Sequence, residues 1–240
     1  MNMQEISIFC LTIPRLSERQ LEIEKMFSSF KINFEFVFGI DAFDLSQSEV
    51  WKAQKSSMAI GGQPLNPGEI ACALGHKMIY QKIVDEKISY AIICEDDIKI
   101  GLVFKSIFDL MSNSEIEFEF MNFMTDAKYR ILKPIFDIYS FCEFTEPPNR
   151  TSCYMINFET AKKLIEFQTP IKYGADTLTG KLSFEAFRSA GITPAIVALR
   201  EFPTTIHEID FGEKKYSFKT RLKKFILRLM VVIPDAIRKF

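Results

Sequence analysis

The chain has 240 residues, of which 48% are hydrophobic and 25% are charged, and its formal net charge is −1. This length and apolar content are sufficient for a globular enzyme of one large domain or two small ones. The charge is uneven, because residues 214–240 carry nine Lys and Arg against Asp235, a balance of +8 that leaves about −9 for the rest. A basic tail on an acidic body excludes a general nucleic-acid binder, whose basic surface would extend across the folded domain.

The cysteines are odd in number and scattered without close pairs: Cys10, Cys72, Cys94, Cys142 and Cys153. Their spacing predicts neither a disulfide framework nor a zinc site. Residues 1–5 lack a basic segment followed by an apolar one, so we expect no secretory signal. The expected location is therefore the reducing cytoplasm.

The N-terminal segment reads as a strand, a helix and a second strand. Residues 5–12 form an apolar run bounded by Pro14, which predicts a buried strand. Ser17 is a candidate N-cap for a helix to about residue 30, and residues 33–40 form the second strand. This order predicts a parallel sheet with a crossover helix, the beginning of a nucleotide-binding α/β layer.

A well-marked helix start follows. Asn66, Pro67 and Glu69 combine an N-cap, a proline at the first helical position and a capping-box glutamate, which predicts a helix to about residue 87. The next strand, residues 88–94, leads directly into the acidic triplet, residues 95–97. Open α/β sheets bind their ligands at the carboxyl ends of such strands.

The second half of the chain is less regular. We expect strands at residues 116–123, 130–138, 151–157 and 192–199, and helices at 158–167 and 176–190 with Gly191 as the C-terminal cap. The whole pattern predicts an α/β fold with a mixed, mainly parallel central sheet. Residues 1–213 would form one domain, followed by the tail, residues 214–240.

The acidic triplet is the strongest chemical signal. Glu95, Asp96 and Asp97 would repel one another unless a cation or hydrogen bonds compensated them. Mg²⁺ and Mn²⁺ prefer carboxylate oxygens and usually share them with substrate phosphates. The alternative is a solvated acidic turn after the strand.

Three segments together resemble glycosyltransferase family 25, the group of lipo-oligosaccharide and collagen galactosyltransferases. They are residues 8–19, residues 65–76 with 90–97, and residues 151–164, and the second is the most specific. Two places depart from the family pattern: Gly75 stands where serine is common, and Ser152-Cys153 replace a small glycine-containing pair.

The resemblance implies a GT-A type fold, a UDP-sugar donor, a Mn²⁺ or Mg²⁺ ion at the triplet and inversion at the anomeric carbon. Glu95 and Asp97 would bind the metal, with His207 as a further ligand or, alternatively, a surface-loop histidine. Asp176 would be the general base, although an aspartate there could also cap a helix. Glu143 and Glu146 are the reserve candidates.

The same resemblance places five residues at the donor site: Thr12, Arg15, Glu69, His76 and Asp96. Two of them, Glu69 and His76, also have alternative roles. Arg15 suits a diphosphate through its paired donors, whereas Arg19 is read as a solvated charge of the first helix. Glu69 would also serve the capping box, and His76 could be a core histidine bonded to backbone.

Residues 218–230 predict a basic amphipathic helix, with apolar positions at helical spacing and Lys or Arg around the other side. Its apolar run is too short to span a bilayer, so it would lie on an anionic membrane surface. The expected location is peripheral to the inner membrane, where a lipid-linked oligosaccharide acceptor would be met. The alternative is that the helix packs on the parent domain or on a second subunit of a homodimer.

The sequence leaves the function between three classes. The favoured one is transfer of a hexose, expected to be galactose, to a lipo-oligosaccharide. A non-catalytic relative that binds a sugar nucleotide or a partner is the main alternative, and the intact triplet argues against it. A two-metal phosphate-ester hydrolase would need more ligands than a chain with two histidines offers. Galactose, glucose and N-acetylhexosamine are not distinguished.

Overall fold

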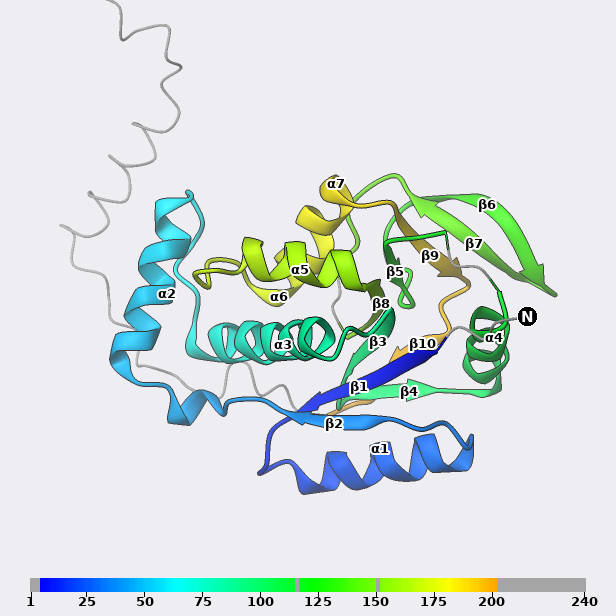
Figure 1. Cartoon of the computed structure of the whole chain (residues 1–240), viewed down its shortest axis with the longest axis horizontal. Coiled ribbons are helices and arrows are strands. Elements are labelled where there is room, and N and C mark those ends of the chain that lie inside the picture. Colours follow the sequence, from blue (N-terminus) through cyan, green and yellow to red (C-terminus); the bar gives the residue numbers. More distant parts are fainter. Residues whose placement is uncertain (1–4, 115–116, 150–151, 203–240) are drawn as a thin grey trace, which may run out of the picture.

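The computed structural model describes residues 5–114, 117–149 and 152–202 (Figure 1). Eight strands form one sheet in the spatial order β2 (Glu35–Phe38), β1 (Ile6–Thr12), β3 (Tyr90–Glu95), β8 (Cys153–Asn157), β5 (Phe120–Asn122), β9 (Ser189–Thr193), β7 (Tyr139–Phe144) and β6 (Tyr129–Phe136). Two further strands, β4 (Ile98–Ile100) and β10 (Val197–Leu199), form an antiparallel pair. The longer helices are α1 (Ser17–Ser29), α2 (Gln47–Ala59), α3 (Pro67–Asp85), α4 (Leu102–Ser112) and α5 (Phe158–Phe167).

The strand directions confirm a mixed, mainly parallel sheet. Strands β2, β1 and β3 are parallel to one another, and so are β5 and β9. Strand β8 is antiparallel to both β3 and β5, and β7 is antiparallel to both β9 and β6. Six of the eight strands therefore point the same way, and β7 and β8 run opposite.

Alternation along β1 divides the core between the two faces of the sheet. Ile6, Ile8 and Cys10 point to one face, where they pack with α1 and α4. Phe9 and Leu11 point to the other face, where they pack with α3 and α5. Because successive strand side chains alternate between faces, a strand covered on both sides reads as a continuous apolar run. This explains the unbroken hydrophobic pattern of residues 8–11 in the sequence.

One of the two predicted helix starts is confirmed and the other is shifted by one residue. Helix α3 has the predicted capping box: Glu69 N–H donates to Asn66 Oδ1 at 2.9 Å, and Asn66 N–H donates to Glu69 Oε2 at 2.7 Å. In α1, however, Ser17 is the first helical residue and Leu16 is the N-cap, with no side-chain cap bond among the described residues.

The helix expected at residues 176–190 is wrong over its last four residues, 187–190. The helical segment consists of α6 (Ala175–Thr177), a π-helical turn (Leu178–Leu182) and α7 (Ser183–Ala186), and Gly191 lies in β9. A Cβ at Gly191 would lie 2.5 Å from Phe144 Cζ, so the glycine allows β9 to pack closely beside β7 and is no helix cap. The strand expected at 192–199 is divided between β9 and β10.

Residues 203–240 lie outside the described residues. The predicted basic tail, residues 214–240, and His207 are therefore not placed by the structure. Within the described part of the chain, no helix is long and apolar enough to cross a membrane.

Helix α3 lies against β1 at a close approach made by Gly75. A Cβ at this position would lie 2.7 Å from Leu11 Cδ1 and 3.0 Å from Leu11 Cδ2. Gly39 approaches the same leucine, and its Cβ would be 3.1 Å from Leu11 Cδ1 and 3.6 Å from Gly75 Cα. The Leu11 side chain therefore occupies the space that a serine side chain at position 75 would need.

We expect Gly75→Val to lower the free energy of unfolding by about 1–3 kcal/mol, because the new side chain overpacks the contact with Leu11. Urea unfolding followed by circular dichroism measures this change. Met78→Val is the matched control, since Met78 is 41% exposed on the same helix and the substitution also introduces a β-branched residue. A loss as large in the control would mean that helix propensity, rather than packing against β1, limits position 75.

Candidate active site

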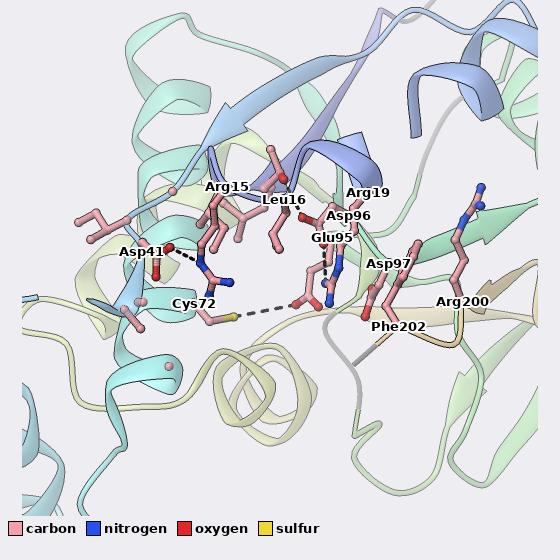
Figure 2. Close-up of a pocket in the computed structure, with 18 of the residues that line it drawn as sticks. Arg15, Leu16, Arg19, Asp41, Cys72, Glu95, Asp96, Asp97, Arg200 and Phe202 are labelled. Carbon is pink, nitrogen blue, oxygen red and sulfur yellow. Dashed lines mark hydrogen bonds and ion pairs between the residues drawn. The ribbon is translucent and has the colours of Figure 1, made fainter. Parts of the chain in front are cut away.

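A cavity of about 350 Å³ opens at the carboxyl ends of β1, β2 and β3 (Figure 2). Its walls come from the segments that follow β1 and β2, the first turns of α1 and α3, and the acidic triplet after β3. Leu199, Arg200 and Phe202 close one side. The three parallel strands end at one edge of the sheet, which is where α/β sheets place their ligands.

Asp96 is held by two donors at the floor of this cavity. Thr12 Oγ1 donates to Asp96 Oδ2 at 2.6 Å, and Arg19 Nη1 donates to Asp96 Oδ1 at 3.0 Å. Burial raises the pKa of Asp96, and the two hydrogen bonds oppose that effect. Both side chains of the ion pair are nearly covered, with 11% of Arg19 and 8% of Asp96 exposed. The expectation that Arg19 is a solvated charge is therefore wrong.

Asp97 is compensated less than Asp96. Its Oδ1 is buried and has no hydrogen-bond partner among the described residues. Burial raises the pKa of Asp97 from 3.8 to about 7, and the negative charges of Glu95 and Asp96 contribute to the increase. A cation bound to this oxygen would offset the repulsion from Glu95 and Asp96 and stabilise the ionised form of Asp97.

Glu95 lies between the cavity and the protein interior. Its Oε1 is 3.3 Å from His76 Nε2 and 4.0 Å from Cys72 Sγ, and its Oε2 accepts from Ser152 Oγ at 3.4 Å. The backbone N–H of Glu95 donates to the carbonyl of Ser152 at 2.9 Å. Ser152, which directly precedes β8 and belongs to the third resembling segment, thus helps to position the first acid of the triplet.

His76 is fully buried and does not line the cavity. Its Nδ1 is 2.8 Å from the Tyr154 hydroxyl, which in turn lies 2.7 Å from the Tyr80 hydroxyl. The expected burial is confirmed, but the expected backbone partner is wrong, because both ring nitrogens face side chains. His76 acts on the site by orienting Glu95.

Arg15 lines the cavity from the turn after β1. Its Nε donates to Asp41 Oδ2 at 2.5 Å, and its guanidinium carbon lies 5.2 Å from the centre of the Phe43 ring. The side chain is 38% exposed, so it remains accessible to a ligand.

The remaining predicted residues lie outside the cavity lining. Glu69 is engaged in the capping box of α3. Asp176 is exposed in the first turn of α6 and accepts from Thr177 N–H at 2.7 Å, while Gly174 is the N-cap. The negative charges of Glu95 and Asp176 both raise the pKa of the Cys72 thiol, after the larger effect of burial, so Asp176 lies near the edge of the site.

The reserve candidates for the general base lie outside the cavity lining. Glu143 pairs with Arg130, and Glu146 pairs with Lys128 Nζ at 3.0 Å. Strand β7, which carries Glu143, is four strands away from β3, or about 19 Å at the usual strand spacing.

The site also contains residues that the sequence did not predict, including Asp41, Cys72 and Phe202. Asp41 had a usable signal, because it follows β2, the parallel neighbour of β1. Cys72 had a weaker signal, one helical turn before His76. Phe202 had none, since its contact with Arg19, 5.0 Å from guanidinium carbon to ring centre, depends on the path of the chain after β10.

The residues present fit a hard divalent cation. Glu95 and Asp97 supply carboxylate oxygens, the ligands that Mg²⁺ and Mn²⁺ prefer. Asp97 Oδ1 lacks a hydrogen-bond partner in the described structure, and like charge contributes to its raised pKa. A cation would compensate that charge.

The sequence matches the model of Glycosyltransferase family 25 (LPS biosynthesis protein) over residues 5–179. The chain belongs to glycosyltransferase family 25. The matched region contains the described cavity except for Leu199, Arg200 and Phe202.

Two curated proteins are similar to parts of this chain. Procollagen galactosyltransferase 2 of Homo sapiens is 22% identical over 170 residues, which are 66% of this chain and 27% of that protein. Lipooligosaccharide biosynthesis protein lic2B of Haemophilus influenzae is 31% identical over 93 residues, 39% of this chain and 34% of that protein. The chain thus spans about a third or less of these relatives.

Two solved structures are distantly similar. One is a glycosyltransferase involved in the glycosylation of the major capsid of PBCV-1, with a TM-score of 0.37, 11% identity and coverage of 69% of this chain and 66% of that chain. The other is A197 from STIV, with a TM-score of 0.39, 8% identity and coverage of 84% and 87%.

For this family 25 member we expect Asp97→Asn to raise the free energy of unfolding at pH 8, by on the order of 2 kcal/mol in a metal-free buffer. Asp97 binds its proton more tightly in the folded chain than in the unfolded chain, so its ionisation costs stability. That cost grows as the pH rises from about 4 to about 7, and the variant lacks it.

Chemical unfolding of both proteins in the presence of EDTA, across this pH range, measures the difference. Asp137→Asn removes the same charge from an exposed turn and should leave the pH profile unchanged. Parallel stability profiles for wild type and Asp97→Asn would contradict the raised pKa.

Proposed function

We propose that the protein transfers a hexose, expected to be galactose, from a UDP-sugar to a lipo-oligosaccharide or lipopolysaccharide acceptor. The observation that carries the proposal is the buried, unpartnered Asp97 oxygen beside Glu95 in a cavity of a family 25 member. The names of the relatives, procollagen galactosyltransferase and lipooligosaccharide biosynthesis protein, support the sugar and the acceptor class. The mixed sheet and the site at its carboxyl edge are consistent with a GT-A type fold.

The donor would bind between β1 and the first turn of α1. The cavity volume of about 350 Å³ is within the range of small-molecule sites. Arg15 would contact the diphosphate through its paired donors, in competition with its present partner Asp41. Thr12 and Arg19 keep Asp96 in place in the cavity lining, and each of its oxygens has a further lone pair that could accept a hydrogen bond from the nucleotide.

The metal would be Mn²⁺ or Mg²⁺. Glu95 and Asp97 would hold it, and His207 is the proposed further ligand. When bound, such an ion supplies electrostatic stabilisation of the diphosphate leaving group. The chain would present two carboxylates that repel one another, and a cation between them would relieve that repulsion.

Inversion requires that the acceptor hydroxyl oxygen form its bond to the anomeric carbon as the bond to the UDP oxygen breaks. Asp176 is proposed to take the hydroxyl proton. Its exposure in the first turn of α6 leaves it open to an incoming acceptor, and its charge acts on Cys72 at the cavity wall.

The acceptor is proposed to be lipid-linked and to be met at the inner-membrane surface. Residues 218–230 would lie on anionic lipid as a basic amphipathic helix, and the alternative remains packing on a second subunit. A non-catalytic family member would bind the nucleotide without turnover. Measuring UDP release and UDP binding together therefore distinguishes it from a transferase.

We expect the protein to release UDP from one UDP-sugar, UDP-galactose, only when Mn²⁺ and truncated lipo-oligosaccharide are both present. A donor panel with coupled detection of UDP measures this, and EDTA should abolish the release. Asp97→Ala should lower kcat by about 10²-fold or more, because the ion loses a ligand.

Glu143→Ala is the matched control, since it removes a carboxylate about 19 Å from β3 and should retain activity. Metal-dependent UDP binding without turnover of any donor would indicate the non-catalytic relative. Absence of both turnover and UDP binding would rule out the proposed function.

We expect Asp176→Asn to lower kcat by about 10²–10⁴-fold, as for loss of a general base, with the affinity for UDP unchanged. Isothermal titration with UDP and Mn²⁺ gives the affinity, and initial rates give kcat. Asp176 lies outside the cavity lining, which is why binding should survive. A variant with full activity would assign the proton transfer to another group.

A further inference from the structure

Three potential metal ligands converge at the inner wall of the cavity. They are Cys72 and His76, four residues apart on α3, and Glu95 at the end of β3. One ligand atom from each, the Cys72 sulfur, a His76 ring nitrogen and a Glu95 carboxylate oxygen, lies within 4.8 Å of the other two. Figure 2 shows the Cys72 sulfur directed at the Glu95 carboxylate.

The spacing of these atoms is close to that of a tetrahedral zinc site. With metal bonds of about 2.0–2.3 Å, ligand atoms around Zn²⁺ lie ~3.3–3.6 Å apart. His76 Nε2 and Glu95 Oε1 are already 3.3 Å apart, and Cys72 Sγ is 4.0 Å from the same oxygen. The Cys72 sulfur would have to come about 0.5 Å closer to Glu95 Oε1 to reach this spacing.

The histidine is held in the orientation that metal binding requires. The Tyr154 hydroxyl lies 2.8 Å from Nδ1, and Tyr80 extends the contact inward, so Nε2 is the nitrogen that faces Glu95. A hydrogen bond to the far ring nitrogen is the usual way in which proteins orient a histidine ligand. His76 is fully buried, which prevents the ring from turning toward solvent.

We propose that Cys72, His76 and Glu95 form a binding site for Zn²⁺ or a similar borderline transition-metal ion, with the fourth position open to the cavity. Thiolate and imidazole ligands favour such ions over Mg²⁺ and Mn²⁺, which prefer oxygen. The thiolate, the neutral imidazole and the carboxylate balance the charge of a divalent ion. On binding, the Sγ–H proton passes to solvent as the Sγ–metal bond forms.

The site shares Glu95 with the Mn²⁺ or Mg²⁺ site of the proposed function. The inhibition inferred from this sharing rests on that function, whereas the ion site itself does not. One carboxylate cannot serve both ions equally, since its Oε1 faces Cys72 and His76. Zn²⁺ would therefore inhibit a Mn²⁺-dependent transfer by withdrawing Glu95. Binding itself requires no transfer activity.

The experiment is a titration of the full-length, reduced protein with Co²⁺ and Cd²⁺, followed by the thiolate-to-metal charge-transfer absorption in the ultraviolet. We expect a saturable band at one ion per chain, displaced by Zn²⁺ and unaffected by Mg²⁺. Cys72→Ser should remove the band or weaken ion binding at least about tenfold. Cys142→Ser is the matched control, because it removes a buried thiol on β7 and should keep the band.

Absence of the band in the wild type, or a band of normal affinity in Cys72→Ser, would overturn the proposal. Glu95→Gln provides a second variant: its ion binding should weaken while the band at saturation persists, since the Sγ–metal bond remains. Circular dichroism confirms that each variant is folded. Because the band reports the Sγ–metal bond directly, failure here leaves the transferase proposal intact, and failure of transfer leaves the ion site intact.

Discussion

Three consecutive carboxylates held at the end of a buried strand dominate the energetics of the site. Glu95, Asp96 and Asp97 repel one another and are partly removed from water, and the pKa values of both aspartates are raised accordingly. The surrounding structure compensates them unequally: Thr12 and Arg19 bind Asp96. Asp97 keeps an oxygen without a hydrogen-bond partner in the described residues. The two aspartates therefore differ: Asp96 is held in place by donors, whereas Asp97 has an oxygen available to a ligand.

The sheet brings the compensating groups to the triplet. Strands β1, β2 and β3 are parallel, so Thr12, Asp41 and the acids follow strand ends at the same edge. Helix α3 can approach β1 closely because Gly75 leaves room for Leu11. The antiparallel strand β8 then places Ser152 and Tyr154 behind Glu95, directly and through His76. The orientation of the first acid thus depends on three separate elements.

Uncompensated charge at a functional site is usually a cost to stability that ligand binding removes. Here that cost is concentrated on Asp97, whereas Glu95 has partners on both of its oxygens. The partners of Oε1 are a thiol and an imidazole, and Oε2 accepts from the Ser152 hydroxyl. Two classes of metal ion, oxygen-preferring and sulfur-preferring, would therefore compete for the same side chain.

The sequence by itself determined the α/β class, the helix start at Asn66 and the position of the acids after a strand, because periodicity, capping and strand ends are local properties. It also carried the family resemblance. It did not determine that Arg19 is buried against Asp96, that His76 orients Glu95, or that Gly191 belongs to β9. Each of these depends on contacts between residues far apart in the chain, such as Tyr154 with His76 or Gly191 with Phe144. Only the tertiary structure decides such contacts, since burial and partners are set by packing.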